Sequence, residues 1–236
     1  MTSAPDAVRA LLFDIDGTLL RSRGSAELFD AAMEEVFGIR GNLRAIRPDG
    51  MTDPDIVARL LDGRTPPCGA ITPRLLASFE MTLARSLGAA VAAGQVEVWT
   101  LPGVEELLAE LASRDDVRLG IVTGNMRATA RVKLEAVGIA GYFRGGGYGS
   151  DSPSRAVLPA VALRRMQRVD GVKLAPERAV VVGDTPHDLH AARAHGMRCV
   201  LVATGQFEAS ELAAAGPDAL LEDLSDLPRA LEAILG

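Results

Sequence analysis

Short runs of consecutive apolar residues alternate along the chain with segments in which apolar residues recur every three or four positions. The apolar runs have strand length and lie at Val8–Phe13, Val117–Thr123, Ala179–Gly183 and Arg198–Ala203. The segments of helical spacing lie at Val104–Ala112, Ala128–Val137, Pro159–Arg168 and Asp188–His195. Gly138 and Gly196 follow two of these segments and suit the left-handed residue after a helix. Strands that alternate with helices predict a doubly wound α/β fold with a parallel sheet.

The interval from residue 22 to residue 100 departs from this alternation. It holds helical patterns at Ser25–Phe37, Pro54–Leu61 and Pro73–Ala93, and no run that reads as a buried strand. Thr52 or Asp53, followed by Pro54, is typical of a helix N-cap with proline in the first turn. We therefore expect residues 22–100 to form an α-helical cap domain, inserted into an α/β core of residues 1–21 and 101–236.

Composition excludes several classes of partner. The chain of 236 residues has a net charge of −6 and no basic tract, so nucleic acid is not expected to bind. Charged residues or glycines interrupt the apolar runs, so no membrane-spanning segment is expected, and the first residues lack the apolar core of a signal peptide. Cys68 and Cys199 are expected to be reduced, which favours a cytoplasmic location.

Two aspartates one residue apart close the first apolar run. Asp14 and Asp16 follow Phe13 and are succeeded at once by Gly17 and Thr18. In an open parallel sheet, ligands bind beyond the carboxyl ends of the strands. Two carboxylates at such a place are costly to hold without a cation or a chemical task. This pair therefore indicates a functional site at the end of the first strand.

Further polar residues stand at or near the ends of later apolar runs. They are Thr123, Gly124 and Asn125 after the second run, Asp184 and Asp188 after the third, and Arg155 between these two groups. Some of these positions also have simpler explanations. Thr123 could be an ordinary β-branched strand residue, and Asp188 or Thr185 could cap the helix that follows.

Together these segments resemble the haloacid dehalogenase superfamily, and in particular its phosphatases with a helical cap after the first strand. The matching segments are Phe13-Asp14-Ile15-Asp16-Gly17-Thr18 for the first motif, Val122-Thr123-Gly124-Asn125 for the second, and Gly183-Asp184-Thr185 with Asp188 for the fourth. The first and fourth motifs in this order, each after an apolar run, make the resemblance specific. It implies a Rossmann-like core and phosphoryl transfer through an aspartyl-phosphate.

The resemblance also implies a role for each matched aspartate. Asp14 would attack phosphorus, and Asp16 would protonate the leaving oxygen and then take a proton from water. Mg²⁺ would be held by Asp14, the backbone carbonyl of Asp16 and Asp184, with Asp188 orienting the shell around the metal. Such a cation would offset the repulsion between a phosphate dianion and an anionic nucleophile.

Thr123 and Arg155 would bind the phosphoryl oxygens and the developing charge, and substrate contacts are implied for four neighbours: Gly17, Thr18, Gly124 and Asn125. Arg155 stands where the family usually has a lysine. Of the two lysines in the chain, Lys173 lies too close to Asp184 to leave room for a helix and a strand. Lys133 falls inside an expected helix, and we place it on the solvated face. Arg164 and Arg165 are likewise expected on a solvated helix face.

The segment Pro48–Asp53 matches the position of the family's substrate-specificity loop. Gly50 would allow close approach to the core, and Thr52 could hydrogen-bond a small polar substrate, although a turn with a helix cap explains the segment equally well. Arg44 and Arg47 could pair with a substrate carboxylate or simply be solvated. The resemblance over core and cap favours phosphoglycolate phosphatase-like members, whose substrate is a small phosphorylated acid.

Other activities fit parts of the pattern. An aspartate at position 16 disfavours a dehalogenase, and the absence of a cap lysine disfavours a phosphonate-cleaving enzyme. A sugar phosphomutase of the same family would keep Asp16 and stays open. A binding or regulatory protein on the same fold would be expected to lose the nucleophile or the metal aspartate, yet Asp14 and Asp184 are both present. The oligomeric state is left open.

Overall fold

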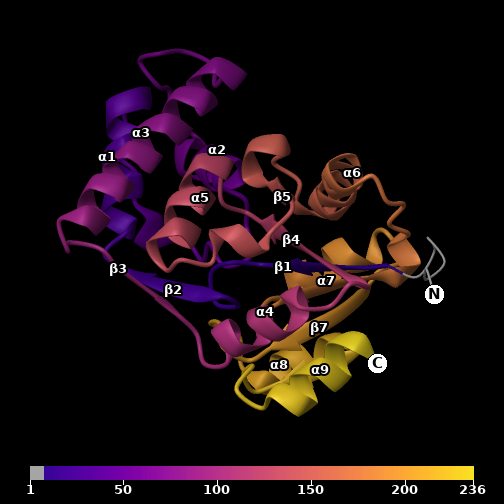
Figure 1. Cartoon of the computed structure of the whole chain (residues 1–236). Helices are drawn as coiled ribbons and strands as arrows, with labels where there is room; N and C mark the ends of the chain where they lie inside the picture. The colour runs from indigo at the N-terminus through magenta and orange to yellow at the C-terminus, as the bar shows by residue number, and fades with distance from the viewer. Residues whose placement is uncertain (1–7) are drawn as a thin grey trace.

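A six-stranded parallel sheet organises the larger part of the molecule (Figure 1). The computed structural model describes residues 8–236, so residues 1–7 of the expected core lie outside the described part. In spatial order the strands are β5 (Gly146–Tyr148), β4 (Val117–Thr123), β1 (Arg9–Phe13), β6 (Ala179–Gly183), β7 (Arg198–Val202) and β8 (Ala219–Leu221). The predicted doubly wound fold is confirmed, and β1 lies between β4 and β6 at its centre.

Helices cover both faces of this sheet, which explains why its strands are continuous apolar runs. One face carries α4 (Val104–Ala112), α5 (Arg127–Ala136) and α9 (Leu227–Leu235), and the other carries α6 (Leu158–Asp170), α7 (Pro186–Arg193) and α8 (Ala209–Ala215). Alternate residues of β1 divide between the two cores, since Leu11 and Phe13 pack on the first face and Ala10 and Leu12 on the second. Short 3₁₀ turns complete the chain: Leu43–Ala45, Ala140–Tyr142, Gly149–Asp151, Arg155–Val157 and Pro176–Arg178.

Three helices from the middle of the chain build a second body beside the sheet (Figure 1). They are α1 (Ala26–Phe37), α2 (Asp53–Leu61) and α3 (Pro73–Ala92). Their core holds three aromatic rings: Phe79 lies 5.0 Å from Phe29 and 5.7 Å from Phe37 between ring centroids. This core also includes Met126, which directly precedes α5 and therefore belongs to the larger part of the molecule. We keep the division into a core domain and a cap domain, with the expected boundaries, as a prediction. Residues 26–92, from α1 to α3, are called the cap only as a name for this second body.

The middle of the chain also contains two strands that the sequence analysis missed. β2 (Leu20–Arg23) and β3 (Glu97–Thr100) pair antiparallel and lie where the chain leaves and re-enters the sheet (Figure 1). Both are short and carry charged, exposed residues, so neither has the apolar run of a buried strand. The three-residue strands β5 and β8 were missed for the same reason of length.

Among the described residues, α3 is the one helix whose length and composition would allow it to cross a membrane. The sequence analysis passed over it because Glu80 and Arg85 interrupt its apolar run. In the fold, Phe79, Leu83 and Leu87 of this helix are buried. The helix packs against α1 and α5 and forms part of the cores between them.

The packing of α3 predicts the effect of truncating Phe79, which is fully buried. Phe79→Ala removes a ring from between Phe29 and Phe37, and such truncations cost about 3–5 kcal/mol because a cavity remains. Met81→Ala on the same helix is the matched control, since Met81 is 62% exposed. We expect urea denaturation to show the loss for Phe79→Ala and a change within about 0.5 kcal/mol for Met81→Ala. Equal effects of the two substitutions would contradict the described core.

Candidate active site

The order of the strands brings the predicted site residues together. β4, β1 and β6 are neighbours, and Thr123, Asp14 and Asp184 lie at or directly after their carboxyl ends. All three are buried, with exposed fractions of 1%, 5% and 3%. Asp188, in the first turn of α7, is fully buried beside them. Carboxylate oxygens of Asp14, Asp184 and Asp188 lie within 4.8 Å of one another.

A single guanidinium lies among these carboxylates. Arg155 Nη2 is 2.9 Å from Asp14 Oδ1 and 2.5 Å from Asp188 Oδ1, and Nη1 donates to the carbonyl of Gly50 at 3.3 Å. Arg155 is 8% exposed, and its Nε has no hydrogen-bond partner among the described residues. The predicted arginine is therefore at the site and bonded to Asp14, with one buried donor still unused.

Burial governs the electrostatics of this cluster. Burial raises the pKa of Asp14 well above its usual range, and the nearby Arg155 only partly offsets this effect. Burial, together with the charges of Asp14 and Asp188, also raises the pKa of Asp184. Because three carboxylates face one guanidinium, the cluster is short of positive charge. A cation at this place would favour the charged form of each carboxylate.

Small residues allow Asp184 to approach the loop after β1. Gly17 has φ +82°, and a Cβ at this position would lie 2.3 Å from Asp184 Oδ2. Thr18 Oγ1 donates to Asp184 Oδ1 at 3.1 Å and is buried. Gly17 and Thr18, predicted to contact substrate, thus both contact Asp184. A Cβ at Gly205 would lie 1.8 Å from the same carboxylate, so a second glycine accommodates it from the β7 side.

Asp16 belongs to a second polar network, which it forms with side chains of β4, α5 and the turn between them. Lys133 Nζ donates to both carboxylate oxygens of Asp16, at 2.8 and 2.7 Å, and to Asn125 Oδ1 at 2.8 Å. Asn125 Nδ2 donates to Asp16 Oδ2 at 2.6 Å and to Thr123 Oγ1 at 2.9 Å. Thr123 Oγ1 also accepts from the Asn125 backbone at 3.2 Å, which leaves the hydroxyl proton available to a ligand.

The position predicted for Lys133 is wrong. Lys133 does not lie on a solvated helix face, because it is 9% exposed and paired with Asp16. A signal was present in the sequence. Ala130 and Leu134 belong to the buried face of α5, and position 133 falls on that same face by helical spacing. A lysine on an apolar helix face needs a polar partner, and the ends of the strands offer one.

The loop before α2 closes over the site from the cap. Asp53 N donates to the carbonyl of Gly124 at 2.8 Å, and Met126 N donates to Asp53 Oδ2 at 2.8 Å. A Cβ at Gly124 would lie 1.9 Å from the carbonyl oxygen of Met51, so only glycine permits this approach. Gly50, with φ +77°, meets the core as predicted, since a Cβ there would lie 2.6 Å from the His187 ring.

Thr52 caps a helix and does not reach the cavity, although a hydrogen bond from Thr52 to substrate was one expectation. Its hydroxyl donates to the carbonyl of Pro153 at 2.8 Å and accepts from Asp55 N, so Thr52 is the N-cap of α2. It is 1% exposed and does not line the cavity. The alternative reading of this segment, a turn with a helix cap, therefore describes Thr52.

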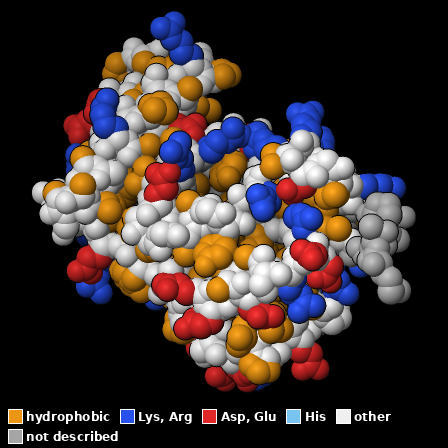
Figure 2. Space-filling view, in the orientation of Figure 1, with side chains coloured by type: hydrophobic (Ala, Val, Ile, Leu, Met, Phe, Trp, Pro, Cys, Tyr) orange, Lys and Arg blue, Asp and Glu red, His pale blue; other side chains and the backbone are white. Residues whose placement is uncertain are grey.

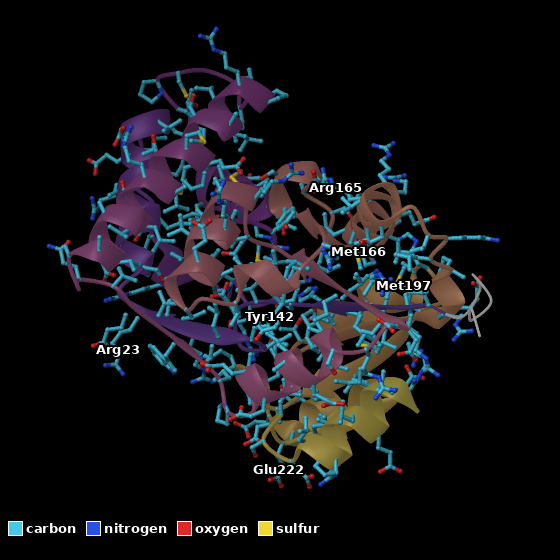
Figure 3. The ribbon with its side chains drawn as sticks, in the orientation of Figure 1. Arg23, Tyr142, Arg165, Met166, Met197 and Glu222 are labelled. Carbon is cyan, nitrogen blue, oxygen red and sulfur yellow. The ribbon has the colours of Figure 1, made fainter. Side chains whose placement is uncertain are left out.

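Of the two residues considered as caps of the next helix, Thr185 is the N-cap of α7. Asp188 is the third helical residue and completes a capping box, because it accepts from the backbone and hydroxyl of Thr185 at 3.1 and 2.7 Å. Arg165, labelled in Figure 3, is not simply solvated, because it bonds Asp151 at 2.6 Å and the carbonyl of Gly146 at 2.8 Å. It holds the turn after β5 to α6.

Arg44 and Arg47, the arginines considered for a substrate carboxylate, have partners within the protein. Arg44 pairs with Glu27, an exposed residue of α1. Arg47 donates to the carbonyl of Gln206 at 3.1 Å, and its guanidinium lies 4.0 Å from the ring centroid of Phe207. Neither arginine lines the cavity. Arg47 instead connects the cap to the loop after β7.

A cavity of about 230 Å³ lies between the carboxylate cluster and the cap helices. Its floor includes Asp14, Asp184, Thr123 and Arg155, and Lys133 lines its side. Its cap side is largely apolar and is lined by Phe29, Leu43, Met51, Ile56, Leu83 and Leu87. Basic and acidic side chains are interspersed over the face seen in Figure 2, which agrees with the absence of a basic tract in the sequence. Both basic groups that line the cavity, Arg155 and Lys133, lie beside its carboxylates.

Comparison with known proteins agrees with this arrangement. The model of the haloacid dehalogenase-like hydrolase family matches residues 11–193. Phosphoglycolate phosphatase of Synechococcus elongatus is 31% identical over 97% of this chain and 99% of its own length. Pyrophosphatase PpaX of Oceanobacillus iheyensis is 25% identical over 94% of this chain and 95% of its own length. The crystal structure of CbbY from Rhodobacter sphaeroides in complex with phosphate is 26% identical, with a TM-score of 0.66 over 93% and 96% of the two chains. The chain belongs to the haloacid dehalogenase-like hydrolase family.

The contact between Gly124 and the cap loop predicts a local effect of adding one methyl group. Gly124→Ala places a Cβ against the Met51 carbonyl and should break the bond from Asp53 N to Gly124 O. Hydrogen exchange at the Asp53 amide should become faster in the native state, because its bond opens more often. Gly141→Ala is the control, since a Cβ there meets nothing within 4 Å. Unchanged exchange at Asp53 in Gly124→Ala would show that the loop does not depend on this contact.

Proposed function

We propose that this member of the haloacid dehalogenase-like hydrolase family is a metal-dependent phosphatase that transfers a phosphoryl group to Asp14. One observation carries the proposal: the Asp14 carboxylate is buried at the end of the central strand, bonded to Arg155 and beside Asp184 and Asp188. A carboxylate can act as a covalent nucleophile. Arg155 orients Asp14 and offsets part of its charge, and a bound cation would supply the positive charge that the cluster still lacks.

The groups around Asp14 suit a phosphoryl group. Arg155 has one buried Nε–H that finds no partner within residues 8–236, and arginine binds phosphoryl oxygens well because it offers several donors in one plane. The Thr123 hydroxyl keeps its proton for an acceptor, because the bonds from Asn125 use only its oxygen lone pairs. Both residues line the cavity floor with Asp14. Thr123 and Arg155 would thus hold the phosphoryl oxygens.

Mg²⁺ fits the donor set at the floor of the cavity. Hard cations prefer carboxylate, carbonyl and water oxygens, and Asp14 and Asp184 provide two buried carboxylates. Asp14, the backbone carbonyl of Asp16 and Asp184 would hold the ion. Asp188 would act indirectly, since its two oxygens are bonded to Arg155 and Thr185. The bound ion would supply charge neutralisation between the phosphate and Asp14.

Two transfers complete the proposed reaction. A carboxylate oxygen of Asp14 forms a bond to phosphorus while the bond from phosphorus to the leaving oxygen breaks. Asp16 enters this step in its protonated form and passes its proton to that oxygen. Water then attacks phosphorus, the bond to Asp14 breaks, and Asp16 takes the proton that water loses. The sum is hydrolysis of a phosphomonoester to an alcohol and phosphate.

The substrate we infer is a small phosphorylated metabolite similar to 2-phosphoglycolate. The size of the cavity favours a small molecule, and the relative from Synechococcus elongatus carries the name phosphoglycolate phosphatase. We also infer a cytoplasmic location, because Cys68 and Cys199 are both free thiols.

Phosphate release tests the proposed function. With Mg²⁺ and a panel of small phosphomonoesters that includes 2-phosphoglycolate, we expect release that EDTA abolishes. Asp14→Asn should lower kcat/KM by about 10⁴-fold or more, the scale on which loss of a nucleophile acts. Asp62→Asn, an exposed residue at the end of α2, is the control and should keep full activity. Retention of activity by Asp14→Asn would refute the assignment of the nucleophile.

Thermal unfolding tests the metal site without any need for turnover. A ligand that binds only the folded state stabilises it, by about 2.7 kcal/mol at a hundredfold excess over Kd. We therefore expect Mg²⁺ to raise the Tm of the wild-type protein by several degrees. Asp184→Asn removes one proposed ligand and should abolish this increase, whatever its own Tm. A similar Mg²⁺-induced increase in Asp184→Asn would contradict the proposed metal site.

A further inference from the structure

The ammonium group of Lys133 is saturated with hydrogen bonds inside the protein. A lysine has three N–H donors, and Lys133 directs them at the two oxygens of Asp16 and at Asn125 Oδ1, all within 2.8 Å. It therefore has no donor left for a substrate in this arrangement. Its side chain is 11% exposed, whereas that of Asp16 is 42% exposed. Lys133 thus restrains the Asp16 carboxylate, while Asp16 itself stays accessible from the cavity.

Asn125 also hydrogen-bonds Asp16 and restrains its carboxylate. Its Nδ2 donates to Asp16 Oδ2 and to Thr123 Oγ1, while its Oδ1 accepts from Lys133. Asp16 thus receives three hydrogen bonds from two side chains, which restrict its rotation. The same amide connects Asp16 to Thr123, the residue assigned to the phosphoryl oxygens. The distance between the proton-transfer group and the phosphoryl site is therefore fixed by α5 and the turn that precedes it.

We propose that Lys133 is a positioning residue for Asp16 in proton transfer to and from the leaving oxygen and water. The inference rests on the proposed phosphatase function and deepens it. Lys133 keeps its own protons: one proton moves from Asp16 to the leaving oxygen as the phosphorus–oxygen bond breaks, and one returns to Asp16 from the attacking water. Small displacements of a proton donor weaken such a transfer strongly, because donor and acceptor must lie within hydrogen-bond reach.

A purely structural role would not require a lysine at position 133. Position 133 faces the apolar side of α5 between Ala130 and Leu134, where an apolar side chain would pack without the cost of burying an ammonium group. Substrate binding would require a free donor, which Lys133 lacks. Orientation of Asp16 accounts for both the burial and the complete use of the three donors.

The dependence on the leaving group separates this role from a structural one. An alkyl phosphate needs a proton at the leaving oxygen, whereas 4-nitrophenolate leaves without one. In single-turnover experiments with Mg²⁺, we expect Lys133→Met to slow alcohol release from an alkyl phosphate by about 10²-fold or more, the usual contribution of general acid catalysis. The first release of 4-nitrophenol should change little. A loss of equal size for both substrates would overturn the proposal, as would no loss for either.

Two further variants complete the design. Lys173→Met alters the only other lysine in the chain, which is exposed, and should behave as the wild type. Lys133→Met placed on Asp16→Asn should add little to the loss caused by Asp16→Asn alone, since a residue that acts through Asp16 has nothing left to position. If the two losses multiply, Lys133 acts by another route. If Lys133→Met does not fold, Asn125→Ala removes the other tether and should show the same selectivity for the leaving group.

A crystal structure keeps the proposal testable apart from phosphatase activity. In Lys133→Met, we expect the Asp16 carboxylate to leave its present position, with the Arg155–Asp14 pair unchanged. An Asp16 side chain that stays in place would overturn the positioning role. A wild-type protein without Mg²⁺-dependent phosphate release would refute the proposed function, whereas wild-type activity with an unselective Lys133→Met variant would refute this inference alone.

Discussion

Three buried carboxylates around one guanidinium impose the main constraint on this molecule. Asp14, Asp184 and Asp188 sit at the carboxyl edge of the sheet, and Arg155 bonds two of them. Burial of charge is costly unless each group is paired, and here positive charge is in deficit. The strand order brings these groups together, because β1 and β6 are neighbours in the sheet. This excess of buried negative charge lies where a bound cation can offset it.

Close backbone approaches then connect the cluster to the cap. Gly17 and Gly205 admit the Asp184 carboxylate, while Gly124 admits the Met51 carbonyl from the cap loop. Arg155 reaches from the core to the Gly50 carbonyl, so the same guanidinium that balances Asp14 also contacts the loop that covers it. The position of the cap loop and the charge balance at the floor of the cavity are therefore physically coupled.

The sequence was sufficient for the features that depend on local pattern. The β4 and β6 strands and α4 agree with their predicted bounds, and the positions of Asp14 and Asp184 at the site follow from motif and strand order. It was insufficient where the environment of a side chain is set by distant segments. Helical spacing could have placed Lys133 on the buried face of α5, but its partner, Asp16, lies 117 positions away in the chain and could not be identified locally. The exposed strands β2 and β3 lack an apolar run, so no local signal marks them.

Chemical trapping of the intermediate tests the central claim most directly, namely that Asp14 carries the phosphoryl group. The wild-type protein would be mixed with Mg²⁺ and a ³²P-labelled phosphomonoester, quenched in acid within one turnover, digested and mapped by mass spectrometry. The account predicts an acid-stable phosphoryl group on the peptide that contains Asp14, and no label in Asp14→Asn. Metal-dependent phosphate release with no labelled peptide at any time would contradict it and indicate direct attack by water.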